Sequence, residues 1–190
     1  MNSNNWISLS GGSVNSVYLK KEVVRRELTS VSLAIHQLLK HLAAKKLSGI
    51  PRLLGYDENY EYLSYIPGES IARPWCDAVK TDLFMASLGK WLKSYHQAVV
   101  DFRLKNDAQF SRGTASPEPE MIVCHSDLGP WNCIQHNGKF QGIIDWDLAH
   151  YGYAIDDLAE MACEFIPIRP YKTPLHGLHH RKVPCIVFSG

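Results

Sequence analysis

The most informative segment of the chain is VCHSDLGPWNCIQHNGKFQGIIDWD, which runs from Val123 to Asp147. Most of this segment is apolar, as in a buried core, yet it contains five notable polar side chains: His125, Asp127, Asn132, Asp145 and Asp147. Carboxylates are rarely buried unless another group pairs with them. The segment therefore predicts a polar site set into a hydrophobic core.

A β-hairpin is predicted inside this segment, because Asn137-Gly138 separates two apolar runs, 133–136 and 139–144. Asn-Gly is the strongest short hairpin signal, since both central residues of the turn need positive φ. A two-residue turn fixes the register, in which the facing pairs are His136–Lys139, Cys133–Gly142 and Asn132–Ile143. Asp145 then lies beside Asn132 at the open end of the hairpin, and Asp127 lies in the loop that enters it.

These side chains suit phosphoryl transfer. An amide oxygen from Asn132 and a carboxylate from Asp145 are hard oxygen ligands of the kind that Mg²⁺ takes, with phosphates and water completing its coordination. A separate carboxylate, Asp127, could orient a hydroxyl group and accept its proton. Phosphoryl transfer needs a metal to neutralise phosphate charge and a base to hold the nucleophile in line. The alternative is a purely structural polar cluster.

Composition and charge place few limits on function. The 190 residues suit one domain or two small lobes, and the net charge of +1 indicates neither nucleic acid nor an anionic membrane as a partner. Residues 68–167 carry eight Lys+Arg and fourteen Asp+Glu, whereas residues 1–67 carry eight and five. The acidic part is either a chance segregation of surface charge or a region that receives a cationic substrate.

Cysteine usage and the N-terminus favour a cytoplasmic location. The five cysteines are scattered without a CxxC pair, which argues against both a disulfide framework and a zinc site. The first twelve residues do not combine a basic region with an apolar run, so no signal peptide is expected. No apolar stretch approaches the ~18 residues of a membrane span.

The hydrophobic pattern predicts two unlike halves. Short strands around 14–24 and 53–65 flank a predicted helix over 28–47, and Ile66-Pro67-Gly68 is a plausible boundary. The second half contains predicted helices over 77–100 and 156–165, a polar loop over 105–120, and the hairpin segment. The order predicts a small sheet with one helix, followed by a mainly helical part.

The motif H-S-D-L-G-P-W-N (125–132), followed by I-D-W-D (144–147), resembles the Brenner motif and the metal-binding aspartate of the aminoglycoside phosphotransferase family. Those enzymes resemble the protein kinases, whose catalytic loop spaces Asp and Asn by the same five residues. The resemblance implies an α+β, protein-kinase-like fold of two lobes. Residues 1–66 would form the nucleotide-binding lobe, and residues 67–190 a catalytic and substrate lobe that is short at its C-terminus.

The resemblance also implies roles for individual residues. Asp127 would be the catalytic base, Asn132 and Asp145 would hold Mg²⁺, and His125 would brace the loop. Asp147 would be either a second metal ligand or a support for the loop. The residues implied in binding ATP, or GTP in its place, are Gly11, Gly12, Ser13, Arg25, Ser64, Tyr65 and Ile66. The alternative for the segment at 11–13 is a plain hairpin turn.

Some neighbouring residues receive less specific interpretations. Arg26 should point to the opposite face of the strand from Arg25 and be solvated. The helix over 28–47 contains no acid, so either the strand arginine finds a partner elsewhere or phosphate positioning is loose. Asp156 and Asp157 are expected to cap the helix that follows them, and His96 is expected to be a satisfied core histidine.

The implied activity is transfer of the γ-phosphate of ATP to a hydroxyl group of a small molecule, such as an aminoglycoside, an amino sugar or another small alcohol. Its partners would be nucleotide and acceptor, with a homodimer possible and no nucleic acid or membrane. Two other hypotheses stay open. The chain could be a kinase-like binding module of an immunity or regulatory type, or a remnant of a longer enzyme.

Overall fold

A five-stranded antiparallel sheet is built entirely from the first third of the chain. The computed structural model describes residues 5–9, 16–72, 75–114 and 117–165. The strand order in this sheet is β1-β2-β3-β5-β4. The strands are β1 (Ile7–Leu9), β2 (Val17–Lys20), β3 (Val23–Glu27), β4 (Leu53–Tyr56) and β5 (Tyr60–Ser64). Neighbouring antiparallel strands such as β2 and β3, or β4 and β5, are joined by short turns. The connection from β3 to β4 runs through α1, and β5 lies between these two strands.

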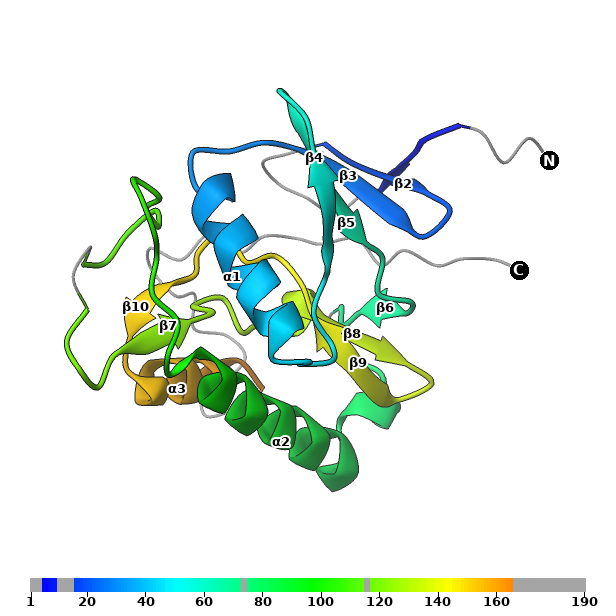
Figure 1. Ribbon diagram of the computed structural model, residues 1–190. Helices are drawn as coiled ribbons and strands as arrows, with labels where there is room; N and C mark the ends of the chain where they lie inside the picture. Colours follow the sequence, from blue (N-terminus) through cyan, green and yellow to red (C-terminus); the bar gives the residue numbers. More distant parts are fainter. Residues whose placement is uncertain (1–4, 10–15, 73–74, 115–116, 166–190) are drawn as a thin grey trace, which may run out of the picture.

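Helix α1 (Ser32–Ala44) lies against one side of this sheet (Figure 1). Its apolar residues recur at helical spacing, and the buried ones include Ile35, Leu38, Leu39 and Leu42. The helix ends before the predicted stop at Gly49 and Pro51, because Lys46 adopts a φ of +59° and the Leu47 backbone N–H donates to the Leu42 carbonyl at 3.1 Å. The stretch of helix predicted over 28–47 is therefore confirmed, but it is shorter by several residues.

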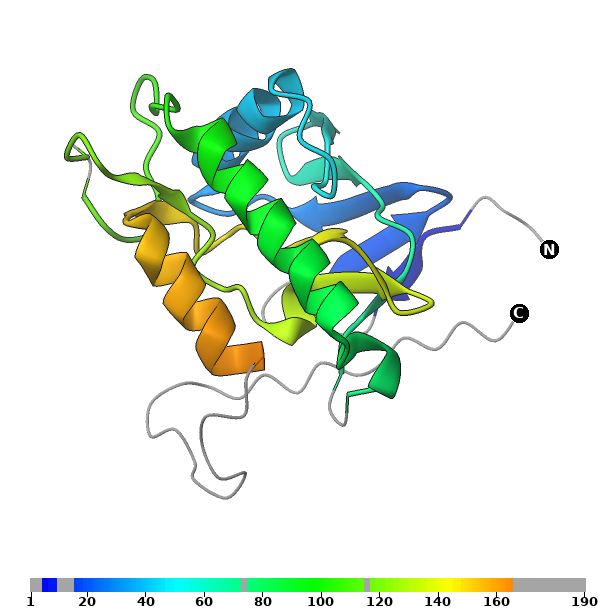
Figure 2. The ribbon, with the colours of Figure 1, turned by 90° about the horizontal axis from the view of Figure 1, so that it is seen from below.

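The second part of the chain, after residue 66, contains two α-helices and several short strands. Its elements are β6 (Glu69–Ser70), η1 (Asp77–Val79), α2 (Asp82–Val99), β7 (Ile122–Cys124), η2 (Pro130–Asn132), β8 (Cys133–His136), β9 (Lys139–Ile143), β10 (His150–Gly152) and α3 (Ala154–Phe165). Helix α2 begins with a cap, in which the Thr81 hydroxyl accepts from the Phe84 backbone N–H at 3.2 Å. Figure 2, seen from below, shows α2 (green) and α3 (orange) side by side in front of the β-strands. The α+β fold class predicted from the sequence is confirmed.

The predicted hairpin is present, with one correction to its register. Asn137 and Gly138 have φ of 50° and 71°, and His136 faces Lys139 as predicted. The prediction that Cys133 faces Gly142 is wrong, because Cys133 faces Ile143. The pairing shifts between Ile134 and Gln135, where a β-bulge adds one residue to β9. Asn132 therefore lies opposite Ile144, whose backbone N–H donates to the Asn132 carbonyl at 2.9 Å.

Two glycines join the hairpin to the segment after α1. The carbonyl of Gly49 accepts from the Ile143 backbone N–H at 2.9 Å. A Cβ atom added to Gly142 would lie 2.5 Å from the Gly49 carbonyl oxygen, which is closer than real Cβ contacts allow. Glycine at this position lets two backbones approach closely. This contact fixes the hairpin, and with it Asn132 and Asp145, against the segment between α1 and β4.

One core runs through both parts of the described chain. It contains the inner side chains of α1 and α2, both strands of the β7–β10 pair, and the ring of Trp146. Trp91, Tyr95 and Trp146 pack within 6.4 Å of one another, ring centre to ring centre. Among the described helices, none is both long enough and apolar enough to cross a bilayer.

Candidate active site

The loop between β7 and β8 holds the carboxylate of Asp127 in place through two side-chain donors. The Trp131 indole N–H donates to Asp127 Oδ1 at 3.2 Å, and the Asn132 amide donates to Asp127 Oδ2 at 2.8 Å. The same Asn132 nitrogen lies 2.9 Å from the Asp127 carbonyl. Asp127 is half-buried, so its carboxylate is fixed in direction yet still reachable. This is the geometry expected of a positioned base.

Asn132 and Asp145 fit a magnesium ion. The amide nitrogen of Asn132 is committed to Asp127, which leaves its side-chain oxygen as an acceptor. Asp145 follows Ile144, the residue bonded to the Asn132 backbone, and its side chain is 38% exposed. Within the described ranges no three His, Cys, Asp or Glu side chains form a metal cluster. One amide oxygen and one carboxylate are the few protein ligands that Mg²⁺ takes when phosphate and water complete its shell, and the metal role of both residues stays a prediction.

His125 connects the Asp127 loop to the segment that carries Asp145. Its Nε2 donates to the Ile144 carbonyl at 3.1 Å, and its ring meets the Trp146 ring edge-on at 4.5 Å. Complete burial lowers the pKa of His125 and outweighs the opposing charges of Asp157 and Asp127. The ring is therefore neutral, and its Nε2–H donates to Ile144. These contacts tie the two segments together, and the bracing role of His125 stays a prediction.

Asp157 is a site residue that the sequence did not reveal. Its buried carboxylate accepts from the backbone N–H of His125 at 3.1 Å and of Ser126 at 3.0 Å. Nε2 of His96 on α2 lies 3.0 Å from the same carboxylate, so the prediction that His96 has a hydrogen-bond partner is confirmed. The prediction that Asp157 caps its own helix is wrong. Asp156 alone does so, by accepting from the Tyr153 backbone N–H at 2.8 Å.

Glu160, one turn further along α3, also supports the loop. Its carboxylate accepts from the Leu128 backbone N–H at 3.2 Å. Burial raises the pKa of Glu160 to about 7, and the charges of Asp127 and Asp157 add to the effect. The signal available in the sequence was the acidic spacing of α3, in which Asp156, Asp157 and Glu160 occupy its first two turns. One helix cap does not need three acids.

The two strand arginines lie on opposite faces of β3, and Arg26 is the one that faces the site. The prediction that Arg26 is solvated is wrong, because its side chain is 11% exposed and pairs with Glu61 and with Asp147 Oδ1, the latter at 2.6 Å. Its Nη1 lies 3.8 Å from Asp145 Oδ1. Burial alone would lower the pKa of Arg26, but Asp147, Glu61 and Asp145 together raise it. Arg26 is not solvated because the register of the sheet places it opposite Glu61 on the neighbouring strand β5.

Arg25 lies on the other face of the sheet, among aromatic rings. Its guanidinium carbon lies 4.5 Å from the ring centre of Trp6, 4.8 Å from that of Tyr18 and 4.6 Å from that of Tyr60. The structure therefore does not bring Arg25 to Asp145, although the sequence resemblance gave it the phosphate position. Which arginine contacts nucleotide stays a prediction.

The remaining predicted nucleotide residues are less fully placed. Gly11, Gly12 and Ser13 lie outside the described residues. Ser64 and Tyr65 already use their backbone N–H groups, which donate to Arg52 at 2.9 Å and to Glu22 at 2.8 Å. Of the three predicted hinge residues, Ile66 is the one whose amide is not committed in this way within the described structure. The adenine-binding role of these three hinge residues stays a prediction.

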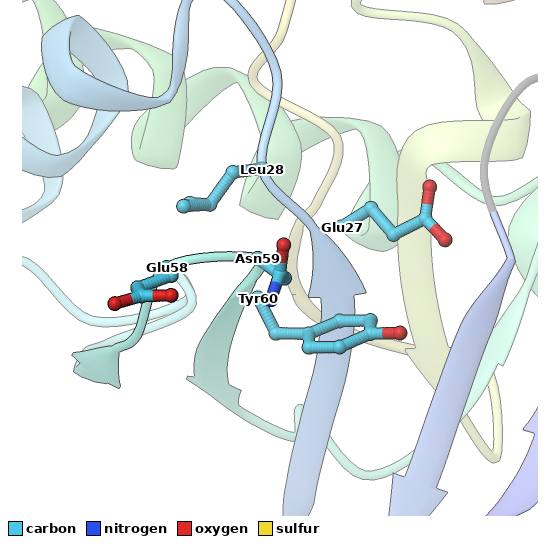
Figure 3. A pocket seen from close by; sticks show the side chains of 5 residues that line it. All are labelled: Glu27, Leu28, Glu58, Asn59 and Tyr60. Carbon is cyan, nitrogen blue, oxygen red and sulfur yellow. The ribbon is translucent and has the colours of Figure 1, made fainter.

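A shallow depression of about 330 Å³ lies at the ends of β3 and β5, away from these residues (Figure 3). Its lining consists of Glu27, Leu28, Glu58, Asn59 and Tyr60. None of the predicted site residues lines it, and its lining contains no lysine or arginine that could hold a phosphate. The constellation around Asp127 is therefore the better candidate for chemistry.

Comparison with known proteins supports this assignment of the fold. Residues 106–181 match the family model described as the phosphotransferase enzyme family, APH. The chain is 31% identical over 166 residues to the trifolitoxin immunity protein of Rhizobium leguminosarum bv. trifolii, a match that covers 84% of this chain and 61% of that protein. The chain thus spans about three fifths of the length of this relative.

Several solved structures share the fold. A choline/ethanolamine kinase family protein from Mesorhizobium loti has a TM-score of 0.59 at 19% identity, covering 85% of this chain and 64% of its own. The macrolide 2′-phosphotransferase MphH from Brachybacterium faecium has a TM-score of 0.62 at 14% identity, covering 84% and 71%. The APH(2″)-IIa enzyme, in a ternary complex with streptomycin and ATP, has a TM-score of 0.58 at 18% identity, covering 81% and 69%.

The fold is therefore that of the protein-kinase-like phosphotransferases. The sequence resemblance to the aminoglycoside phosphotransferase family is confirmed by the family match, which includes Asp127, Asn132 and Asp145.

Proposed function

We propose that this chain moves the γ-phosphate of ATP, with Mg²⁺, to a hydroxyl group of a small molecule, with GTP as the alternative nucleotide. Residues 1–66 would bind the nucleotide, and residues 67–190 would supply the catalytic loop and the acceptor side. The observation that carries the proposal is the Asp127 carboxylate, oriented by Trp131 and by Asn132, whose backbone carbonyl accepts from Ile144, the residue before Asp145. A protein that only binds a ligand has little need of this combination.

In the proposed reaction, Asp127 accepts the proton of the acceptor hydroxyl while the oxygen of that hydroxyl forms a bond to the γ-phosphorus. The bond between that phosphorus and the bridging oxygen of the β-phosphate breaks, and ADP leaves. Asp127 is suited to this role because its direction is fixed by two donors, while Asp157 holds the backbone of the preceding two residues. Positioning and electrostatic stabilisation supply most of the catalysis in this chemistry.

Asn132 and Asp145 would hold the metal ion, which supplies neutralisation of the phosphate charge when it is bound. Arg26 would be the second source of positive charge, because it is the strand arginine that lies toward Asp145. Arg25 takes no part in this version of the proposal. Asp147 holds Arg26 at 2.6 Å, which favours a supporting role over metal ligation.

The acceptor side is acidic, and this favours an acceptor that carries amino groups. Residues 68–167 have a net charge of −6. Glu160 adds a carboxyl group close to Asp127, one that accepts from the Leu128 backbone N–H. An aminoglycoside-like molecule, an amino sugar or another small amino alcohol fits this charge. A cytoplasmic location, where ATP and Mg²⁺ are available, goes with the proposal.

The first experiment is a set of melting curves with and without ATP, in Mg²⁺ or in EDTA, for the wild type, Asp145→Ala and Asp107→Asn. A ligand at ~100 times its dissociation constant stabilises by about 2.7 kcal/mol, which raises the melting temperature by several degrees. The proposal expects a rise that needs Mg²⁺ and is lost in Asp145→Ala. Asp107 is an exposed loop carboxylate, so its variant should keep the rise.

Turnover then tests the role of Asp127. With an acceptor found by screening amino sugars and amino alcohols, Asp127→Asn should lose nearly all acceptor-dependent ADP release and still bind MgATP. Normal turnover in this variant would refute the assignment of the base.

A second candidate function follows from the relative named as an immunity protein. In this version the chain protects a cell by binding a toxic small molecule or a nucleotide without transferring phosphate. Acceptor-dependent consumption of ATP separates the two functions. If protection in cells survives Asp127→Asn, the binding module is favoured, and if protection is lost while the protein stays folded, phosphate transfer is favoured.

A further inference from the structure

Glu61 is a fully buried carboxylate that the proposed reaction does not use directly. It lies in the middle of β5, and its two oxygens have different partners. One oxygen accepts from Nε of Arg26 on β3, and the other lies 2.5 Å from Nε2 of His36 on α1. Burial raises the pKa of Glu61, but His36 and Arg26 outweigh that effect and lower the pKa below its ordinary value. Glu61 is therefore a charged link between a strand and a helix.

The side of the guanidinium that Glu61 contacts is informative. The guanidinium group is planar and rigid, so fixing its Nε edge also fixes the direction of its two terminal nitrogens. Those nitrogens lie 2.6 Å from Asp147 and 3.8 Å from Asp145, on the side of the predicted metal and phosphates. Glu61 thus takes only the Nε edge of Arg26, and the terminal nitrogens face Asp147 and Asp145, the residues that flank the predicted metal position.

His36 supplies the connection to the helix. The histidine is buried, and its ring stacks on Tyr56 with a centroid distance of 4.8 Å, so that its Nε2 points at Glu61. Helix α1 has no aspartate or glutamate of its own. The helix therefore contributes to the arginine through a histidine and a glutamate from the neighbouring strand.

We infer that Glu61 and His36 are the positioning pair for Arg26, and that they hold its terminal nitrogens toward the β- and γ-phosphates of the nucleotide. This inference rests on the proposed function. In this arrangement Glu61 on β5 takes the place of an acid on helix α1. The position of α1 then affects phosphate recognition through His36. Neither residue touches the nucleotide, so both act through Arg26.

The test compares affinity for MgATP with affinity for adenosine, which lacks the phosphates. Glu61→Gln keeps the shape of the side chain and removes its charge. We expect it to weaken MgATP binding about tenfold or more, as for loss of a hydrogen bond to a charged group, and to leave adenosine binding unchanged. The matched control is Glu27→Gln, an exposed glutamate next to Arg26 that lines the depression of Figure 3, and it should change neither.

His36 provides a second and milder variant. His36→Phe removes the contact with Glu61 and should weaken MgATP binding about fivefold, whereas His36→Gln keeps a donor and should restore affinity to within about twofold of wild type. The Arg26 Nε–H signal in ¹⁵N NMR reports the same geometry without nucleotide. It should move in Glu61→Gln and His36→Phe, and stay in His41→Gln, a variant of another histidine on α1.

The outcomes are separable. If the wild type binds MgATP while Glu61→Gln and His36→Phe keep the wild-type ratio of MgATP to adenosine affinity, the inference is overturned and the proposed function stands. Equal weakening of both ligands would show a structural role and would also overturn it. A wild type that does not bind MgATP overturns the proposed function and this inference together.

Discussion

Arg25 and Arg26 are adjacent on β3 and have identical side chains, yet they lie in opposite environments. Arg26 is held by carboxylates, from Glu61 in the sheet and from Asp147 beyond the hairpin. Arg25 is surrounded by the faces of three aromatic rings, at 4.5 to 4.8 Å from its guanidinium carbon. Successive residues of a strand point to opposite faces, so one step along the chain exchanges an ionic site for an aromatic one.

The difference shows that the partner, more than the residue type, sets what a charge contributes. A buried carboxylate left without its cation keeps its full desolvation cost, whereas aromatic rings left without a cation lose only a weak attraction. The two arginines should therefore differ in stability, in pH response and in salt response.

The largest effect is expected from removing each arginine in turn. Arg26→Met should lower the free energy of unfolding by about 3–5 kcal/mol, because Glu61 would remain buried and charged without its cation. Arg25→Met should lower it by only about 1 kcal/mol, since it loses cation–π contacts and keeps its packing. Urea denaturation of both variants measures the difference. Equal losses would mean that the two faces are energetically alike.

The comparison extends to two glutamates, Glu61, which is fully buried beside a cation, and Glu160, which is half-buried near other carboxylates. The raised pKa of Glu160, about 7, means that the folded state binds more protons than the unfolded state between about pH 4.5 and 7. Stability from this group is therefore lost as pH rises through that window. Glu160→Gln should be more stable than wild type by about 1 kcal/mol at pH 8, allowing for its partial exposure, and nearly equal at pH 5.

Glu61 should respond with the opposite sign. Its pKa is lowered, so its contribution to stability is present above the ordinary glutamate pKa and is lost as pH falls through the folded value. Glu61→Gln should therefore be less stable than wild type at pH 7, and the gap should narrow in acid. Urea denaturation at pH 4, 5, 7 and 8 measures both variants. Curves of the same sign for Glu61→Gln and Glu160→Gln would contradict the distinction between them.

A smaller effect is expected on the aromatic side. Tyr18→Leu removes one of the rings that face Arg25 and should cost about 0.5 kcal/mol. Tyr18→Phe keeps the ring face and should cost less. Thermal melts of the two variants provide the measurement, and a larger loss for phenylalanine than for leucine would rule out a contribution from the ring.

The smallest effect is expected at the surface, where distance alone is misleading. Lys45 Nζ lies 2.6 Å from Asp101 Oδ2, the same separation as between Arg26 Nη2 and Asp147 Oδ1, but both partners are exposed. Water and salt screen such a pair. Lys45→Met should leave the denaturation midpoint unchanged. A loss comparable to that of Arg26→Met would show that burial does not decide the value of these ion pairs.

Local signals in the sequence predicted much of the site. The Asn137-Gly138 turn, the loop with Asp127 and the placement of Asn132 near Asp145 all follow from chemistry within 25 residues. The bulge in β9 was not predictable, because nothing in the composition of Gln141 and Gly142 marks which residue is left unpaired. It moved the register by one residue and still left Asn132 and Asp145 neighbours.

Contacts across long sequence distances could not be predicted. Strand alternation correctly separates Arg25 from Arg26, but it cannot tell which face is covered by the second part of the chain. Glu61 is 35 residues from Arg26, and Asp157 is 32 residues from the His125 amide that it accepts from. Their roles depend on which strands pair and on where α3 packs, and both are tertiary properties.

The contact between Gly49 and Gly142 has a consequence for how this sequence can vary. A side chain at residue 142 would meet the backbone of residue 49, and a change at residue 49 cannot make room for it, because the obstacle is a carbonyl oxygen. No second substitution compensates for such a clash. A library of all single substitutions, selected for folded protein, should therefore recover only glycine at position 142, even though this residue takes no part in any proposed chemistry.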